Sequence, residues 1–134
     1  MKIGFCVVNY SELPVEEVCR IAADNGYDAV ELPAYTDNGQ VDVEELLKGG
    51  KAKELKKMVE SHGLFISALS NHADSPLIMG PYSAGMDSIC PGTKEEKIKF
   101  GQESMIRSAQ LAAELGVESV VAFSGMENYG HIND

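Results

Sequence analysis

Four short hydrophobic runs, separated by segments with a longer hydrophobic period, organise the chain. The runs cover residues 2–8, 29–32, 64–69 and 119–123. They are rich in β-branched and aromatic residues, which is typical of β-strands. Because nearly every position in them is hydrophobic, we expect parallel strands that are covered on both faces.

The segments between the runs have the period of an α-helix. Hydrophobic residues recur at intervals of three and four, which predicts helices that begin near Val15 and that cover residues 51–61 and 94–115. A short extra turn is expected near residues 42–45. The predicted inward positions are Val15, Val18, Cys19 and Ala22 in the first helix, Ala52, Leu55, Met58 and Val59 in the second, and Ile98, Met105, Ala109 and Ala112 in the third. Phe100 and Leu111 lie off the third stripe and are expected to contact a neighbouring helix or subunit.

Glycine residues mark the ends of the predicted helices. Gly26, Gly63 and Gly116 each stand between a helical segment and the next hydrophobic run. Glycine adopts the left-handed conformation of a helix C-terminus without a steric clash, so these residues are predicted C-terminal caps. At the start of the longest helix, Thr93 and Glu96 have the spacing of a capping box.

The order of elements is β-α-β-α-β-α-β, which predicts parallel strands joined by right-handed crossovers. Two architectures use this order: an open doubly wound sheet and a (β/α)₈ barrel. An open sheet would usually keep a helix after its fourth strand, and the residues after Phe123 have no helical pattern. We therefore expect one partial domain over residues 1–134, the N-terminal half of a TIM barrel, with the open sheet as the alternative.

Composition and charge exclude some partners. The chain has 21 acidic and 11 basic residues, a formal charge of -10, and no basic patch, so we expect no nucleic-acid partner. Three cysteines without CxxC spacing indicate reduced thiols in a cytoplasmic protein, with Cys6 and Cys19 in the core. The N-terminal hydrophobic run is too short to span a membrane and lacks a cleavage site, so neither an anchor nor a signal peptide is expected.

The connection from about residue 70 to residue 92 is unusually long. Connections of this length tend to be functional lids or disordered segments. This one is too hydrophobic for a plain linker, since it contains Leu77, Ile78, Met79, Tyr82 and Met86. We expect it to lie as a lid over the mouth of the barrel.

Polar and aromatic residues follow the hydrophobic runs where the strands are predicted to end. In a barrel the C-terminal ends of the strands form the active-site face. The candidates there are Asn9, Tyr10, Glu31, Tyr35, Asn71, His72, Ser124 and Glu127. His72 is either a loop histidine bonded to a neighbour or a contact to substrate or metal. Glu31 either accepts backbone hydrogen bonds or orients a substrate hydroxyl.

Several stretches resemble a known family. "GYDAVELPAY", "ISALSNHADSPL" and the region of residues 92–125 together resemble the N-terminal half of the sugar phosphate isomerase/epimerase group. That group belongs to the xylose isomerase-like TIM barrels, which also include nucleases of the endonuclease IV type. In the second stretch Asn71, His72, Pro76 and Leu77 match the group's signature, and Ala73 stands where the signature has glycine.

The resemblance implies a metal-dependent sugar or sugar-phosphate isomerase or epimerase, of which this chain is the N-terminal half. Full-length members bind a divalent metal (Mn, Mg, Co or Zn) at the strand ends, and most ligands and acid/base glutamates lie on later strands. We therefore assign no catalytic residue. The expected substrate-binding residues are His72, Glu31, Asn71, Tyr10 and Glu127, with His72 also a candidate metal ligand.

Two other functions remain open at this stage. One is a metal phosphodiesterase of the endonuclease IV type, which the acidic charge and the lack of basic loops disfavour. The other is a non-catalytic half-barrel that assembles with itself. In such a half-barrel both outer strands expose unpaired backbone groups and the inner face is wet, so we expect a homo-oligomer.

Overall fold

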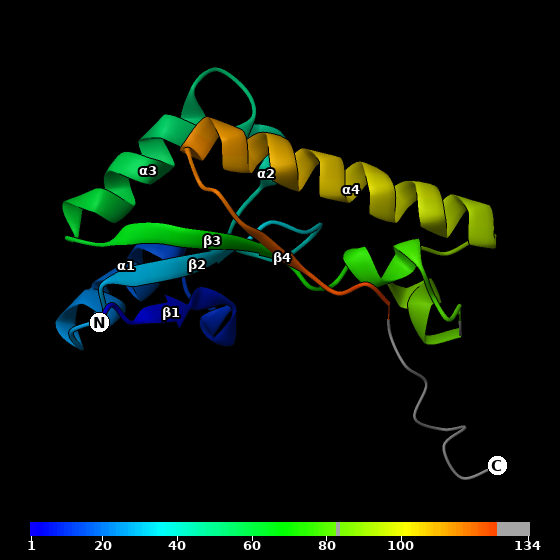
Figure 1. Ribbon diagram of the computed structural model, residues 1–134, viewed down its shortest axis with the longest axis horizontal. Coiled ribbons are helices and arrows are strands. Elements are labelled where there is room, and N and C mark those ends of the chain that lie inside the picture. Colours follow the sequence, from blue (N-terminus) through cyan, green and yellow to red (C-terminus); the bar gives the residue numbers. More distant parts are fainter. Residues whose placement is uncertain (83, 126–134) are drawn as a thin grey trace, which may run out of the picture.

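The sheet contains four parallel strands whose order in space, β1-β2-β3-β4, is their order in the chain (Figure 1). The computed structural model of the chain describes residues 1–82 and 84–125. The strands are β1 (Gly4–Cys6), β2 (Ala29–Pro33), β3 (Phe65–Asn71) and β4 (Val120–Ala122). Helical crossovers join them, as the sequence predicts, because a tight turn cannot join parallel neighbours.

The crossovers contain the α-helices α1 (Val15–Asp24), α2 (Val43–Leu46), α3 (Lys51–Ser61) and α4 (Lys94–Leu115), and the short 3-10 segments η1 (Val7–Tyr10), η2 (Ser75–Ile78) and η3 (Ala84–Ser88). The predicted caps are confirmed. Gly26, Gly63 and Gly116 have φ angles of 78°, 76° and 69°. Thr93 and Glu96 form the capping box of α4. Among the described helices, none has the length and hydrophobicity to span a membrane.

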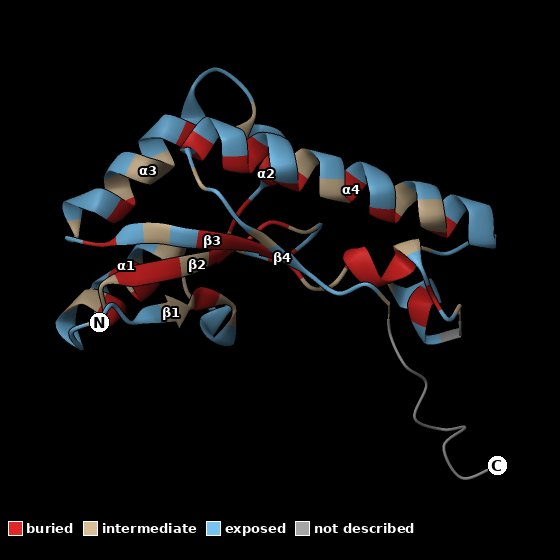
Figure 2. Cartoon of the chain, viewed as in Figure 1, coloured by how far each residue is buried: buried red, intermediate tan, exposed pale blue. Residues whose placement is uncertain are grey.

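The described helices lie on one face of the sheet. The hydrophobic core joins Val30 and Leu32 of β2 and Leu69 of β3 to side chains from α1, α3 and α4. Figure 2 shows the buried residues of α3 and α4 on the sides that face the sheet. A doubly wound sheet needs helices on both faces, so that alternative is excluded. The fold is α/β, with four parallel strands alternating with helices as in half of a TIM barrel.

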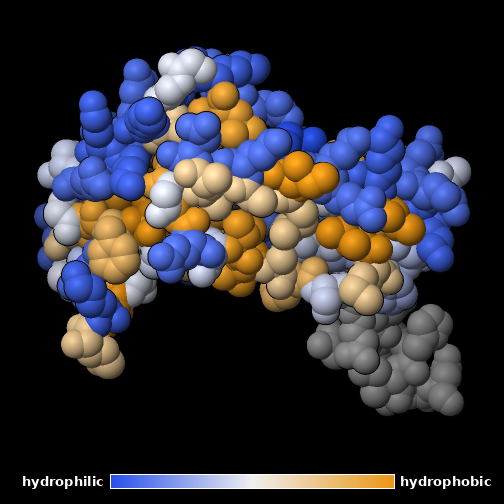
Figure 3. All heavy atoms as spheres, turned by 45° about the horizontal axis from the view of Figure 1, so that its top comes forward, coloured by the Kyte–Doolittle hydropathy of each residue, from blue (hydrophilic) through white to orange (hydrophobic). Residues whose placement is uncertain are grey.

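The opposite face of the sheet, called the inner face below, is open within the described residues. Phe65 is 41% exposed and Val121 is 40% exposed, and the sheet register places both on this face. Figure 3 shows hydrophobic side chains on the surface between the hydrophilic regions. The prediction that the strands are covered on both faces is therefore wrong at Phe65 and Val121, whereas Ala29 and Ser70 on the same face are buried. The first strand is also shorter than predicted, because residues 7–10 turn into η1 and Val7 enters the core.

The buried face of α4 differs from the predicted stripe. Its buried residues are Lys97, Gly101, Ser104, Ser108, Leu111, Ala112 and Leu115. Ala109 is exposed and Met105 is only half-buried, so the predicted stripe is wrong at these two positions, and Leu111, which was expected off the stripe, is in the core. The side of α4 that faces the rest of the chain therefore contains small residues, and η2 packs closely against Gly101 there.

The long connection after β3 packs against α4. Leu77 and Met86 are fully buried, and Lys97 of α4 binds the connection through its ammonium group. Nζ of Lys97 lies 2.6 Å from Oδ1 of Asp87 and donates to the carbonyl of Gly92 at 2.6 Å. Figure 1 shows η2 and η3 beneath the N-terminal half of α4. In the described residues this connection packs along α4, whereas the sequence predicts a lid over the mouth of the barrel.

Removing Asp87, the partner of the buried Lys97 ammonium group, tests how the connection is held to α4. We expect Asp87→Ala to lower the free energy of unfolding by about 1 kcal/mol, because Lys97 stays buried with only one acceptor. Glu103→Ala removes an exposed ion pair with Lys99 and should change the stability by less than about 0.5 kcal/mol. Urea unfolding followed by circular dichroism measures both; equal effects would contradict the assigned role of Lys97.

Candidate functional site

The C-terminal ends of β1 and β2 place a thiol beside a carboxylate on the inner face. The register sets Cys6 opposite Glu31, and Sγ of Cys6 donates a hydrogen bond to Oε1 of Glu31 at 3.4 Å. Burial and the negative charge of Glu31 raise the pKa of Cys6. The prediction that Cys6 belongs to the core is therefore wrong. Cys19 is in the core as predicted, and burial raises its pKa to about 11.

Tyr35 adds a phenol after the end of β2. Its side chain is half-buried. Burial raises the pKa of Tyr35, and the charge of Asp74 and that of Cys6 in its thiolate form raise it further. The phenol therefore stays protonated at neutral pH and can donate a hydrogen bond to a ligand.

His72 follows the last residue of β3 and stacks on an aromatic ring. The centroids of the His72 and Phe123 rings are 4.9 Å apart, and their planes are inclined by 25°. Phe123 follows β4, so the pair joins the ends of two neighbouring strands. His72 is half-buried, which leaves part of the imidazole accessible to a ligand. His72 therefore lies where the strand-end rule places it, at the C-terminal edge of the sheet, which is called the rim below.

Asn71 is fully buried and points toward α4. Its Nδ2 donates to Oγ of Ser104 at 2.9 Å and to Oγ of Ser108 at 3.0 Å. Its Oδ1 accepts hydrogen bonds from the backbone amides of Asp74 and Ser75 at 3.2 and 3.1 Å. The side-chain amide is thus hydrogen-bonded within the chain and holds β3 to α4, whereas the sequence predicts a contact with substrate.

The remaining predicted residues are spread over other places. Tyr10 packs against Phe5, with ring centroids 5.7 Å apart, in a hollow on the α1 side of β1. It is therefore not brought together with Glu31 and His72. Asn9 donates to the carbonyl of Cys6 at 3.4 Å. Ser124 is exposed, and Glu127 lies outside the described residues.

A divalent metal needs several ligands at one point. Within residues 1–82 and 84–125, no three His, Cys, Asp or Glu side chains lie close enough together to hold a metal ion. Glu31 and Cys6 are a pair, and His72 contacts an aromatic ring. The described residues therefore do not form a complete ligand set, and we derive no step through a metal.

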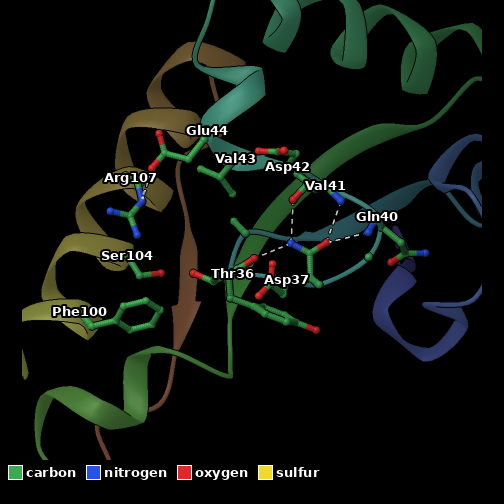
Figure 4. Close-up of a pocket in the computed structure, with 14 residues that line it drawn as sticks. Thr36, Asp37, Gln40, Val41, Asp42, Val43, Glu44, Phe100, Ser104 and Arg107 are labelled. Atoms are coloured by element: carbon green, nitrogen blue, oxygen red, sulfur yellow. Dashed lines mark hydrogen bonds and ion pairs between the residues drawn. The ribbon is translucent and has the colours of Figure 1, made fainter. Parts of the chain in front are cut away.

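A groove lies between α4 and the segment 34–44 (Figure 4). Its volume is about 710 Å³. Phe100 and Ser104 project from α4 toward Thr36 and Asp37, and Arg107 lies beside Glu44. At one end Nε of Arg107 donates to Oε1 of Glu44 at 3.0 Å.

The side-chain amide of Asn38 holds the segment 34–44 in place by hydrogen bonds. It donates to the carbonyls of Tyr35 and Val41 at 2.6 and 2.8 Å, and accepts from the amides of Gln40 and Val41 at 3.0 and 2.7 Å. These bonds fix the loop that begins at Tyr35. Neither Glu31 nor His72 lines the groove, but Tyr35 does, so the groove adjoins the strand ends at this residue.

Sequence reasoning missed three residues that support the rim. Asp74 is buried, and its Oδ2 accepts from the amide of Thr36 at 2.8 Å and from Oγ of Ser104 at 2.6 Å. Ser108 donates to the carbonyl of Ala34 at 2.5 Å. The usable signal is the spacing of Gly101, Ser104 and Ser108, which places three small residues on one face of α4.

Replacing Glu31 with glutamine tests the pair on the inner face. Because the carboxylate helps to raise the pKa of Cys6, its removal should lower that pKa and increase the thiolate fraction at pH 8. Alkylation of Cys6 by iodoacetamide, followed by mass spectrometry, should become several-fold faster, while Cys19 stays protected in the core. Glu16→Gln is the matched control, and an unchanged Cys6 rate in Glu31→Gln contradicts the contact.

The comparisons with known proteins agree with this geometry. A family model described as xylose isomerase-like TIM barrel matches residues 19–133. Among solved structures, the probable 3-DHS dehydratase AsbF involved in petrobactin synthesis from Bacillus anthracis is similar in fold, with a TM-score of 0.52 and 16% sequence identity over 92% of this chain and 38% of that one. The chain thus spans less than half the length of this relative. No curated protein matches the sequence.

With four parallel strands, helices on one face and polar residues at the strand ends, the chain belongs to the xylose isomerase-like TIM barrel family.

Proposed function

We propose that the chain supplies part of the substrate-binding face of a sugar or sugar-phosphate isomerase or epimerase. The family includes such enzymes beside others, such as dehydratases. The observation that carries the proposal is the group of polar and aromatic side chains at the C-terminal strand ends of the open inner face. Glu31 with Cys6, and His72 with Phe123, are its two pairs.

These side chains suit a hydroxyl-rich ligand. The Glu31 carboxylate can accept hydrogen bonds from hydroxyl groups, and the Tyr35 phenol can donate one. The exposed Phe123 ring offers an apolar surface to the C–H face of a sugar ring.

Sugar binding tests the proposal. The isotope-labelled chain is titrated with aldoses, ketoses and sugar phosphates in the presence of Mg²⁺, and NMR resonances are followed. We expect shifts of the His72 and Phe123 resonances, and at least about tenfold weaker binding in Glu31→Gln, because a charged acceptor is lost. Glu60→Gln, an exposed change on α3, is the control. Absence of binding by every sugar, or binding that Glu31→Gln leaves unchanged, contradicts the proposal.

We also propose that the inner face and the outer strands mediate self-association. Ile3, Phe65, Val121 and Phe123 are exposed. Within the described residues, β1 and β4 are each paired on one side only. Exposed hydrophobic side chains beside unpaired strand edges favour association with a second copy.

Sedimentation velocity over a range of concentrations tests self-association. We expect the chain to form oligomers and Val121→Lys to weaken them, because a charge on the inner face opposes burial there. Ile106→Lys places the same charge at an exposed hydrophobic position of α4 and should have little effect. A concentration-independent monomer contradicts the proposal.

A further inference from the structure

The imidazole of His72 stacks on the ring of Phe123. Among the described residues, its imidazole makes no hydrogen bond, and its ring centroid lies 4.9 Å from that of Phe123. Phe123 is itself 54% exposed, so burial does not fix its ring. Something other than core packing must therefore hold Phe123 in place.

One hydrogen bond holds the backbone of Phe123. Its amide donates to Oγ of Ser75 at 2.9 Å. Ser75 is the first residue of η2 and is fully buried. This bond joins the end of β4 to the turn that follows β3, across 48 residues of sequence.

Two hydrogen bonds to Asn71 fix Ser75 in turn. Its hydroxyl donates to the backbone carbonyl of Asn71, and its amide donates to Oδ1 of Asn71 at 3.1 Å. Asn71 is anchored to α4 through Ser104 and Ser108. The hydroxyl proton of Ser75 is thus used by Asn71, which leaves the oxygen lone pair directed to the amide of Phe123.

We propose that Ser75 is a positioning residue that holds the Phe123 ring against His72 and so sets the direction of the imidazole at the rim of the sheet. Ser75 does not touch the substrate; it acts through Phe123. The value of this orientation for ligand binding rests on the proposed function, whereas the orientation itself does not.

Proton NMR of the His72 ring tests the positioning. The ring current of Phe123 shifts the His72 ring protons, and Phe123→Leu, which removes the aromatic ring, gives the unstacked reference. We expect Ser75→Ala to move these resonances toward the Phe123→Leu values and Ser75→Thr, which keeps the hydroxyl, to restore them. Ser70→Ala removes a neighbouring buried hydroxyl that has no partner in the described residues, and should leave the His72 resonances unchanged.

A second measurement covers the case in which Ser75→Ala does not fold. In the unaltered chain the bonded amide of Phe123 should exchange with D₂O at least about tenfold more slowly than in the urea-unfolded chain. Exchange at the unfolded rate, or His72 resonances that Ser75→Ala leaves unchanged while Phe123→Leu shifts them, overturns the proposal. Absence of sugar binding with these resonances responding as expected overturns the proposed function alone.

Discussion

Replacing Asn71 with alanine is expected to lower the free energy of unfolding by about 4 kcal/mol, because each buried polar group that loses its partner costs about 1–3 kcal/mol. The side chain is 0% exposed, and it bonds two backbone amides, two serine hydroxyls and the backbone carbonyl of Ala34. The change leaves the amides of Asp74 and Ser75 without their acceptor. Ser104 and Ser108 keep hydrogen bonds to other groups, so most of the expected loss comes from the two amides.

Urea unfolding followed by circular dichroism measures this effect. Asn25→Ala is the matched control, because Nδ2 of Asn25 also bonds a backbone carbonyl, that of Ile21 at 2.8 Å, but at an exposed position. It should cost less than about 1 kcal/mol. If the two variants unfold at the same urea concentration, the buried network does not hold β3 to α4.

The elements that the sequence predicts well depend on local rules. Gly26, Gly63 and Gly116 cap helices because their conformation depends on a few neighbouring residues. The bounds of α3 and α4 agree with the prediction because periodicity and capping residues act within one helix. The order of strands and helices follows from these boundaries.

The buried face of α4 could not be predicted by counting hydrophobic residues. Gly101, Ser104 and Ser108 face the strand ends because a close backbone and a buried amide lie there. A search for hydrophobic stripes treats such positions as solvent-facing. The partners are 33 and 37 residues away in the sequence, which no local pattern shows.

The candidate site was predicted only in part for a similar reason. The strand-end rule located Glu31 and His72, because the ends of parallel strands lie at one edge of a sheet. The prediction that Cys6 lies in the core was wrong because a strand that is hydrophobic throughout does not indicate which of its residues face the helices. Asn71 and His72 are neighbours in the sequence, but consecutive strand residues point to opposite faces, so one supports the rim and the other lies on it.

Replacing Gly101 with alanine is expected to lower the free energy of unfolding by about 2 kcal/mol, against the usual preference for alanine in a helix. In an open helix this change would gain about 1 kcal/mol. Here a Cβ atom would lie 2.9 Å from the carbonyl oxygen of Asp74, 3.1 Å from Cγ1 of Ile78 and 3.2 Å from Cβ of Leu77. The carbonyl cannot move freely because it accepts the amide of Leu77. Overpacking of this kind costs more than the gain in helix propensity.

The sign of the change decides between close packing and propensity. Gln102→Ala, at the exposed neighbouring position of α4, changes helix propensity without a clash and should alter the stability by less than about 0.5 kcal/mol. If Gly101→Ala unfolds at a higher urea concentration than the unaltered chain, η2 does not pack on α4 at this distance. Because the contact at Gly101 also fixes the turn that carries Ser75, the His72 ring resonances of Gly101→Ala should move in the same direction as those of Ser75→Ala.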